Sequence, residues 1–93
     1  MAYLVNVPRR AQKDLAKIDG RYRNRILVSL VHIGNDPYIG KKLDGDRKGQ
    51  WSYRVWPYRI IYEIHKHELV VLVLRIGHRQ GGVLMNLIIT EPV

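Results

Sequence analysis

The sequence has no cysteine and no apolar run that approaches the roughly 20 residues needed for a membrane-spanning helix. The absence of cysteine excludes disulfide bonds and thiolate metal ligands, and it fits a reducing cytoplasm. The N-terminal residues also lack the long apolar core of a secretory signal peptide. We therefore expect an unexported, cytoplasmic protein without a membrane partner.

Metal ligands are scarce as well. The four histidines are spread at a spacing that matches no zinc-binding pattern, at His32, His65, His67 and His78. The acidic residues form no cluster that would suit Mg²⁺. Scattered, solvent-exposed histidines are the better interpretation, and we expect no metal site and no other cofactor.

Negative charge is also in short supply. Eight Asp and Glu residues oppose 16 Lys and Arg residues, which gives a formal net charge of +8. A surplus of this size favours a polyanionic partner, and nucleic acid is the interpretation we prefer. Two alternatives stay open, because an acidic protein would be attracted by the same positive charge and a basic surface can serve solubility alone.

The N-terminal segment predicts a short strand followed by a helix. Residues 2–7 are rich in β-formers, and the strand is expected to end at Pro8. Pro8 is well placed to open a helix, which we expect to reach Ile18 because apolar residues recur there at spacings of three and four.

A second helix is expected from about Arg21 to Ile33, where apolar residues again recur at helical spacing. Its first turns carry a cluster of cations, which are Arg21, Arg23 and Arg25. The helix dipole favours anions at that end, so the cluster does not stabilise an isolated helix. Either a neighbouring carboxylate compensates these arginines, or they meet a polyanion.

The stretch from Gln50 to Arg79 predicts three consecutive strands. Apolar and polar residues alternate with period two on both sides of Pro57, which is typical of a half-buried hairpin that turns at Trp56–Pro57. A polar turn at residues 65–68 leads into an almost unbroken apolar run over residues 69–76. That run is typical of a central strand covered on both faces.

The element order β-α-α-β-β-β predicts a single α+β domain over residues 1–93. We expect a mainly antiparallel four-stranded sheet with both N-terminal helices packed on one face, and a concave, basic surface on the other. Residues 38–49 are interpreted as an irregular charged loop. The apolar residues 83–89 are expected to pack on the core or to be covered by a partner.

Two motifs at this separation resemble a known family. YRIIYEI begins at Tyr58 and RIGHR ends at Arg79, and both follow the charged segment 42–49. Together they resemble the RelE/ParE superfamily of bacterial toxins, over nearly the whole chain. The resemblance implies a ribosome-dependent endoribonuclease that cuts mRNA in the ribosomal A site without a metal, and that a cognate antitoxin holds inactive.

The resemblance also implies a basic catalytic site. The positions that match it are Arg54, Arg59 and Arg79, with His78 beside them. Attack of a ribose 2′-oxygen on its own 3′ phosphate needs positive charge on the phosphate oxygens and groups that move protons, which arginine and histidine can supply. The alternatives are an ion pair with Glu63 for Arg59 and a solvated strand position for Arg54.

Further residues are candidates for binding RNA around that site. These RNA-binding candidates are Lys42, Lys48, Trp51 and Arg75. A lysine in the charged loop could reach a ligand lying on the sheet, and Trp51 could stack on a splayed base. Core packing is an equally good interpretation of Trp51.

The chain departs from the family pattern in two places. Ser52 stands where relatives often have a second basic residue, and Val83-Leu84-Met85 stands where they have a tyrosine beyond the last strand. The missing tyrosine predicts weaker cleavage. Two alternative functions therefore remain, a noncatalytic ParE-like inhibitor of DNA gyrase and an inactive relative that only binds its antitoxin.

Overall fold

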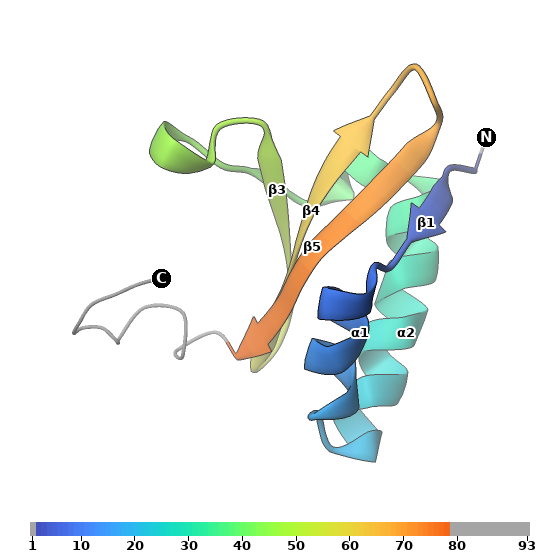
Figure 1. Cartoon of the computed structure of the whole chain (residues 1–93), viewed down its shortest axis with the longest axis vertical. Helices are drawn as coiled ribbons and strands as arrows, with labels where there is room; N and C mark the ends of the chain where they lie inside the picture. The colour runs from blue at the N-terminus through green and yellow to red at the C-terminus, as the bar shows by residue number, and fades with distance from the viewer. Residues whose placement is uncertain (1, 79–93) are drawn as a thin grey trace.

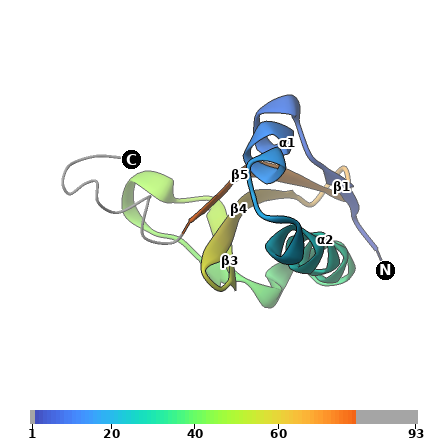
Figure 2. The same cartoon turned by 90° about the horizontal axis from the view of Figure 1, so that it is seen from below.

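Residues 2–78 are described by a computed structural model, shown in Figure 1. In chain order the elements are β1 (Leu4–Asn6), α1 (Arg9–Ala16), α2 (Gly20–Asn35), the 3-10 helix η1 (Pro37–Ile39), β2 (Lys41–Lys42), the 3-10 helix η2 (Gly45–Arg47), β3 (Gln50–Val55), β4 (Tyr58–His65) and β5 (Val70–His78). Both helices follow β1 and lie on the same side of the sheet (Figure 2), as expected for an α+β fold. No helix within this part of the chain is long and apolar enough to cross a lipid bilayer.

The turn between the helices explains most of the arginine cluster. Asp19 caps α2, because its carboxylate accepts a hydrogen bond from the Arg21 backbone N–H at 2.9 Å and also pairs with the Arg21 guanidinium at 3.4 Å. Arg23 donates from Nη2 to the carbonyl of Ile18 at 2.8 Å, just beyond the end of α1. A carboxylate thus compensates Arg21, and backbone carbonyls bind Arg23. Arg25 is the member of the cluster that these contacts leave unexplained.

The sheet differs from the prediction in strand number and in direction. Within residues 2–78 its order is β1-β5-β4-β3-β2, and β3, β4 and β5 form the expected antiparallel meander. The expectation of four strands is wrong, because β2 adds a fifth. β1 pairs with β5 in parallel, with Leu4 opposite Val70, so the sheet is mixed. Residue patterns identify a strand but not its neighbour, which is why the parallel pair escaped the sequence analysis.

The segment 38–49 is more ordered than an irregular loop. β2 consists of two residues, with Lys41 paired to Ser52 and Lys42 to Trp51, and a 3-10 helix stands on each side of it. Two residues are too few to show a period-two alternation, so the pattern could not reveal this strand. Its pairing fixes the two lysines beside β3.

The core lies between the helices and one face of the sheet. Its buried residues are Ala11, Ile18, Ile26, Leu30 and Ile33 from the helical segment, and Val55, Ile60, Tyr62, Val71, Val73 and Ile76 from the sheet. Successive strand residues point to opposite faces, so the residues between these project away from the helices. We call this second surface the open face, and it carries Ser52, Arg54, Arg59, Glu63 and Arg75.

Tyr62 connects the sheet centre to η1. Its side chain is fully buried, and its hydroxyl donates a hydrogen bond to the carbonyl of Pro37 at 2.7 Å. Burial raises the pKa of Tyr62 to about 12, so the phenol remains a donor at neutral pH. A Cβ at Gly40 would overlap the Tyr62 hydroxyl oxygen and approach the carbonyl oxygen of Ser52 to 2.8 Å. Glycine is therefore needed at position 40 for this close approach.

Tyr62→Phe should lower the free energy of unfolding by about 1–3 kcal/mol, because it leaves the buried Pro37 carbonyl without its donor. Urea denaturation followed by tryptophan fluorescence measures the change. Tyr58→Phe, on the same strand but half-buried, is the matched control and should stay within about 0.5 kcal/mol of the wild type. Equal losses in the two variants would contradict this role of the Tyr62 hydroxyl.

One carboxylate attaches α1 to β5. β1 pairs only with residues 70–72, and further along β5 the helix α1 lies beside the strand (Figure 1). The Asp14 side chain, only 11% exposed, accepts hydrogen bonds from the backbone N–H of Ile76 at 3.0 Å and from Nε of Arg75 at 2.9 Å. Burial works to raise the pKa of Asp14, but the hydrogen bonds from Arg75 and Ile76 outweigh it and lower the pKa overall.

Asp14→Ala should lower the free energy of unfolding by about 1–3 kcal/mol at neutral pH. Because the folded-state pKa is lowered, this stabilisation is complete above the unfolded value of 3.8 and is lost as pH falls through the folded pKa. Urea titrations of wild type and variant at a series of pH values should therefore converge below about pH 3.8. Asp46→Ala, which removes an exposed carboxylate from η2, should show no comparable difference at neutral pH.

Candidate functional site

Two arginines face each other on the open face. Arg54 of β3 and Arg59 of β4 are direct cross-strand partners two pairs from the turn at Trp56–Pro57. Like charges directly opposite one another in a sheet repel, and an anion bound between them relieves the repulsion. On the far side of Arg59 the cross-strand residue is Gly77, which adds no side chain to this surface. The arrangement leaves room for an anionic group over the two guanidinium groups.

These arginines line a small concavity of about 150 Å³, which we call the basic hollow. Its lining residues are Lys41, Leu43, Ser52, Arg54 and Arg59. Three cations thus converge there, and none of the described residues that line the hollow is acidic. A concave surface of one charge concentrates the field on a bound anion, so the hollow suits a phosphate group.

Lys41 is the cation that the sequence analysis missed. It pairs with Ser52 across β2 and β3, and strand alternation places it on the open face. Lys42, which was predicted to bind RNA, pairs instead with Trp51 on the side that faces the helices, and its own side chain is exposed. Recognition of β2 would have distinguished the two lysines, because neighbouring strand residues point to opposite faces.

His78 lies on the other face of the sheet from Arg54 and Arg59. It is the cross-strand partner of Tyr58, and the two rings form an edge-to-face pair with centroids 5.4 Å apart. The centroid of the Tyr58 ring in turn lies 5.6 Å from that of the Tyr22 ring of α2, so Tyr58 and His78 both lie on the helix side of the sheet. The expectation that His78 stands beside the two arginines is therefore wrong. Gly77, one residue earlier, occupies the position that faces them.

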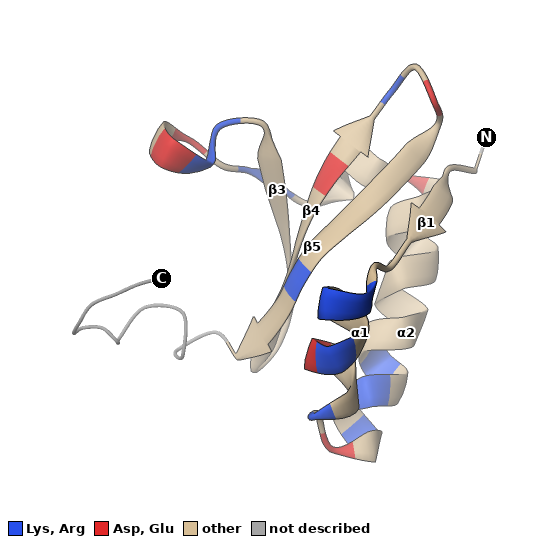
Figure 3. Cartoon of the chain, viewed as in Figure 1, with Lys and Arg blue, Asp and Glu red and all other residues tan. Residues whose placement is uncertain are grey.

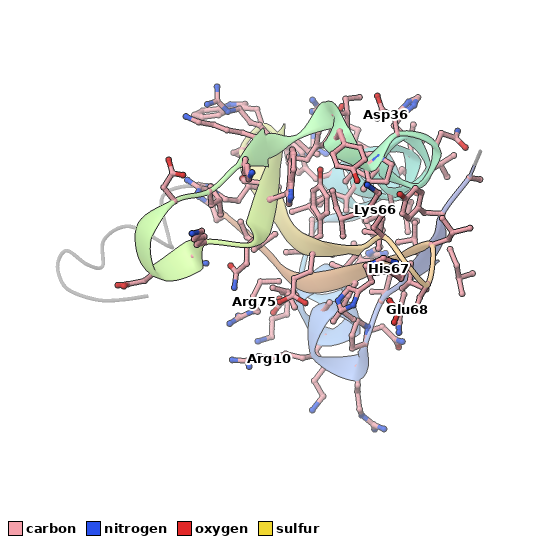
Figure 4. The ribbon with its side chains drawn as sticks, turned by 90° about the horizontal axis from the view of Figure 1, so that it is seen from above. Arg10, Asp36, Lys66, His67, Glu68 and Arg75 are labelled. Atoms are coloured by element: carbon pink, nitrogen blue, oxygen red, sulfur yellow. The ribbon has the colours of Figure 1, made fainter. Side chains whose placement is uncertain are left out.

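The remaining candidates are dispersed. Trp51 packs against the core and forms an edge-to-face pair with Tyr38 at 5.4 Å, which supports its structural interpretation. Lys48 is exposed at the end of η2, on the approach to β3. Arg75, labelled in Figure 4, donates hydrogen bonds to Asp14 of α1 and is not among the residues that line the hollow. Arg79 and residues 83–89 lie outside the described residues.

Basic charge also extends beyond the open face. Lys and Arg residues run along α1 and the first turns of α2 (Figure 3). Within residues 2–78 no group of three or more His, Cys, Asp or Glu side chains could hold a metal ion. The chemistry that the hollow offers is therefore positive charge and forked hydrogen-bond donors.

Comparison with known proteins identifies the fold and the motifs. The family described as "ParE toxin of type II toxin-antitoxin system, parDE" matches residues 5–81. The chain belongs to the ParE toxin family. Toxin RelG of Mycobacterium tuberculosis is 32% identical to this ParE-family toxin over 85 residues, which cover 85% of the chain and 93% of RelG. The resemblance to the RelE/ParE superfamily is thus confirmed.

Solved structures agree with this membership. The toxin–antitoxin complex RelBE2 from Mycobacterium tuberculosis contains a chain that matches with a TM-score of 0.80 at 28% identity, covering 85% of this ParE-family chain and 93% of that one. A free-state mutant of Escherichia coli toxin RelE matches with a TM-score of 0.74 at 26% identity, covering 87% of each chain. The overall fold is therefore shared with solved RelE toxins.

Proposed function

We propose that this toxin is an endoribonuclease that cuts mRNA in the ribosomal A site. The observation that carries the proposal is the basic hollow, where Lys41, Arg54 and Arg59 converge on the open face without a carboxylate among the lining residues. The resemblance to the RelE/ParE superfamily, which implies this activity, supports the proposal, and RelG and a solved RelE toxin match this chain over most of their length.

The chemistry is an internal transfer at one phosphate. The ribose 2′-oxygen attacks the adjacent phosphorus and loses its proton, the bond to the 5′-oxygen breaks, and the leaving oxygen takes up a proton. A 2′,3′-cyclic phosphate and a 5′-hydroxyl remain. Negative charge grows on the equatorial oxygens during the attack, and in this proposal Arg54 and Arg59 stabilise that charge with their guanidinium donors. Ser52 stands where relatives often have a basic residue and carries no charge. Lys41, its cross-strand partner, supplies a further cation beside it.

Arg79 belongs to this proposal through its family motif, as a further cation at the same phosphate. His78 lies at the end of β5 on the helix side, and we assign it no contact with the reacting phosphate. Lys48 and Arg75 are assigned a weaker part, which is attraction of the RNA backbone rather than contact with the reacting phosphate.

The proposed partners are the ribosome, its mRNA and a cognate antitoxin. The Mycobacterium tuberculosis match is a toxin in complex with its antitoxin, and this chain shares that fold over most of its length. A chain with a net charge of +8 suits an antitoxin that is acidic where it covers the basic surface. Copurification from the native operon tests this pairing.

The central test compares two targets in one experiment. The toxin is expressed briefly, ribosome-bound mRNA ends are mapped, and gyrase-linked DNA breaks are scored in the same cells. The proposal expects new mRNA ends within codons and no rise in DNA breaks. DNA breaks without mRNA cleavage would overturn it.

Gyrase inhibition is the second candidate, and one observation favours it. The matching family is the one described for ParE toxins. A gyrase inhibitor needs no hollow that accommodates a phosphate, so its activity should survive the loss of Arg59. The Arg59→Ala variant therefore separates the two candidates.

Cleavage by the purified toxin should not need a metal bound to the toxin itself. The donors in the hollow are cationic nitrogens, which repel Mg²⁺ rather than bind it. The toxin is preincubated with a chelator, freed of it by gel filtration, and added to untreated ribosomes. We expect full cleavage and 2′,3′-cyclic phosphate ends; loss of activity that Mg²⁺ restores would contradict the mechanism.

A further inference from the structure

A second concavity lies on the helix side of β3, between that strand and α2. It measures about 470 Å³, and we call it the α2–β3 groove. Its lining residues include Arg25 and Val28 of α2, Arg54 of β3, and Trp56 at the turn between β3 and β4. None of the described residues that line it is acidic. The volume falls within the range of about 300–1,000 Å³ that is usual for small-ligand sites.

The charge of the groove has an identifiable origin. Asp19 and the carbonyls near the end of α1 bind Arg21 and Arg23, whereas Arg25 projects toward the groove. The Arg25 guanidinium lies 5.8 Å from the centroid of the Tyr22 ring, a cation–π contact that restricts its position. The last member of the arginine cluster is therefore the one that fits the second alternative of the sequence analysis, in which these arginines meet a polyanion.

The groove also has an apolar wall with an aromatic side chain. Trp56 is 53% exposed and Val28 is 56% exposed, although both are apolar residues at the edge of the same concavity. An exposed tryptophan beside forked cations is the combination by which proteins bind single-stranded nucleic acid, with bases stacked on the ring and phosphates on the cations.

One residue connects the groove to the basic hollow. Arg54 lines both concavities, one on each side of β3. β2 pairs only with Trp51 and Ser52, so within residues 2–78 the outer edge of β3 carries no further strand next to Arg54. A chain of phosphates can therefore pass from one concavity to the other over this edge.

We propose that the α2–β3 groove binds a second stretch of the same single-stranded RNA, one or a few nucleotides from the phosphate held in the basic hollow. Trp56 stacks on a base, and Arg25 and Arg54 bind the flanking phosphates. The inference rests on the proposed function, because it extends the path of that substrate. It assigns to α2 a share in substrate binding that is separate from the reacting phosphate.

The test measures binding without cleavage. The probes are fluorescein-labelled 2′-O-methyl oligouridylates, which lack the attacking hydroxyl. A trimer is long enough for one concavity and is expected to occupy the basic hollow with its three cations, whereas a decamer is long enough for both. Fluorescence anisotropy gives Kd for the full-length toxin at several salt concentrations. Trp56→Ala should weaken decamer binding by about 5- to 150-fold, the loss expected for one stacked base, and leave trimer binding unchanged.

Matched variants separate stacking and charge from folding. Trp56→Phe should restore most of the decamer affinity, because it keeps a ring at the same place. Arg25→Ala should reduce the slope of log Kd against log salt for the decamer by the amount expected for about one phosphate contact. Lys66→Ala removes the same charge from the turn between β4 and β5, and it should leave the ratio of decamer affinity to trimer affinity unchanged. Thermal denaturation verifies that each variant is folded.

The outcomes distinguish the two proposals. If Arg59→Ala weakens both oligonucleotides and Trp56→Ala weakens neither, the groove inference is overturned and RNA binding in the hollow stands. If neither substitution weakens either probe, both proposals are overturned. An equal loss for trimer and decamer in Trp56→Ala also overturns the inference, because the groove would then not extend the binding path.

Discussion

Arg59→Ala should reduce mRNA cleavage on the ribosome by about 10²- to 10³-fold, while the protein remains folded. Arg59 is half-buried on the central strand β4, directly opposite Arg54, and we assign its guanidinium donors to the reacting phosphate. Loss of one such donor to the charge that develops in the transition state costs about 2.7–4 kcal/mol. Single-turnover cleavage of a programmed ribosome complex, with toxin in excess, measures the rate directly.

Two control variants test whether the loss of cleavage is specific to the hollow or follows from the loss of any positive charge. Lys48→Ala removes a cation from the loop after η2 and should weaken the apparent affinity for the programmed ribosome without slowing the chemical step. Arg10→Ala removes the same charge from α1, none of whose residues lines the hollow; the Arg10 side chain is labelled in Figure 4. If either control slows cleavage as much as Arg59→Ala, net charge rather than the hollow is responsible.

Arg54→Ala should reduce cleavage by about 10²-fold and, unlike Arg59→Ala, should weaken binding to long RNA more than to short RNA. The reason is its position, because Arg54 lines both the basic hollow and the α2–β3 groove. Anisotropy with the trimer and decamer probes, together with single-turnover rates, measures the two effects on one protein.

Arg54→Lys tests whether geometry or charge matters at this position. Lysine keeps the positive charge but not the planar fork of donors, so the salt dependence of binding should return while the cleavage rate stays low. A lysine variant with the wild-type rate would show that Arg54 acts only through its charge. Thermal unfolding should be close to wild type in both variants, because Arg54 is exposed.

Much of the fold was predictable where a period was long enough to read. The alternation on both sides of Pro57 predicted the β3–β4 hairpin and put Arg54 and Arg59 on one face, and the register confirms both. The partner of β1 was not predictable, because pairing with β5 joins residues more than sixty positions apart. β2 was missed because two residues show no period.

The candidate site was predictable to the same extent. The expected last strand ended at Ile76, but β5 continues to His78. The run over residues 69–76 shows no apolar–polar alternation, and a register shift opposite Ile61 and Tyr62 changes which residues of β5 face the helices. The sequence could therefore not assign Gly77 to the open face and His78 to the helix side. Lys41 depended on β2, and the α2–β3 groove depends on how α2 packs beside β3. Packing of this kind joins distant residues, which local patterns do not reveal.

The pairing of β1 with β5 also has a consequence for the order in which the chain is synthesised. A nascent chain emerges from its N-terminus, and β1 has no neighbour in the sheet until Val70 to Leu72 have followed it. Until then β3 and β4 carry both arginines on a hairpin that is extended only by the two paired residues of β2 and lacks the long strand β5. A two-stranded hairpin alone is at best marginally stable in water. An interrupted translation product that ends before β5 therefore contains Arg54 and Arg59 but not the rigid surface that aligns them. The sheet that carries both arginines is therefore complete only when almost the whole described chain has left the ribosome that made it.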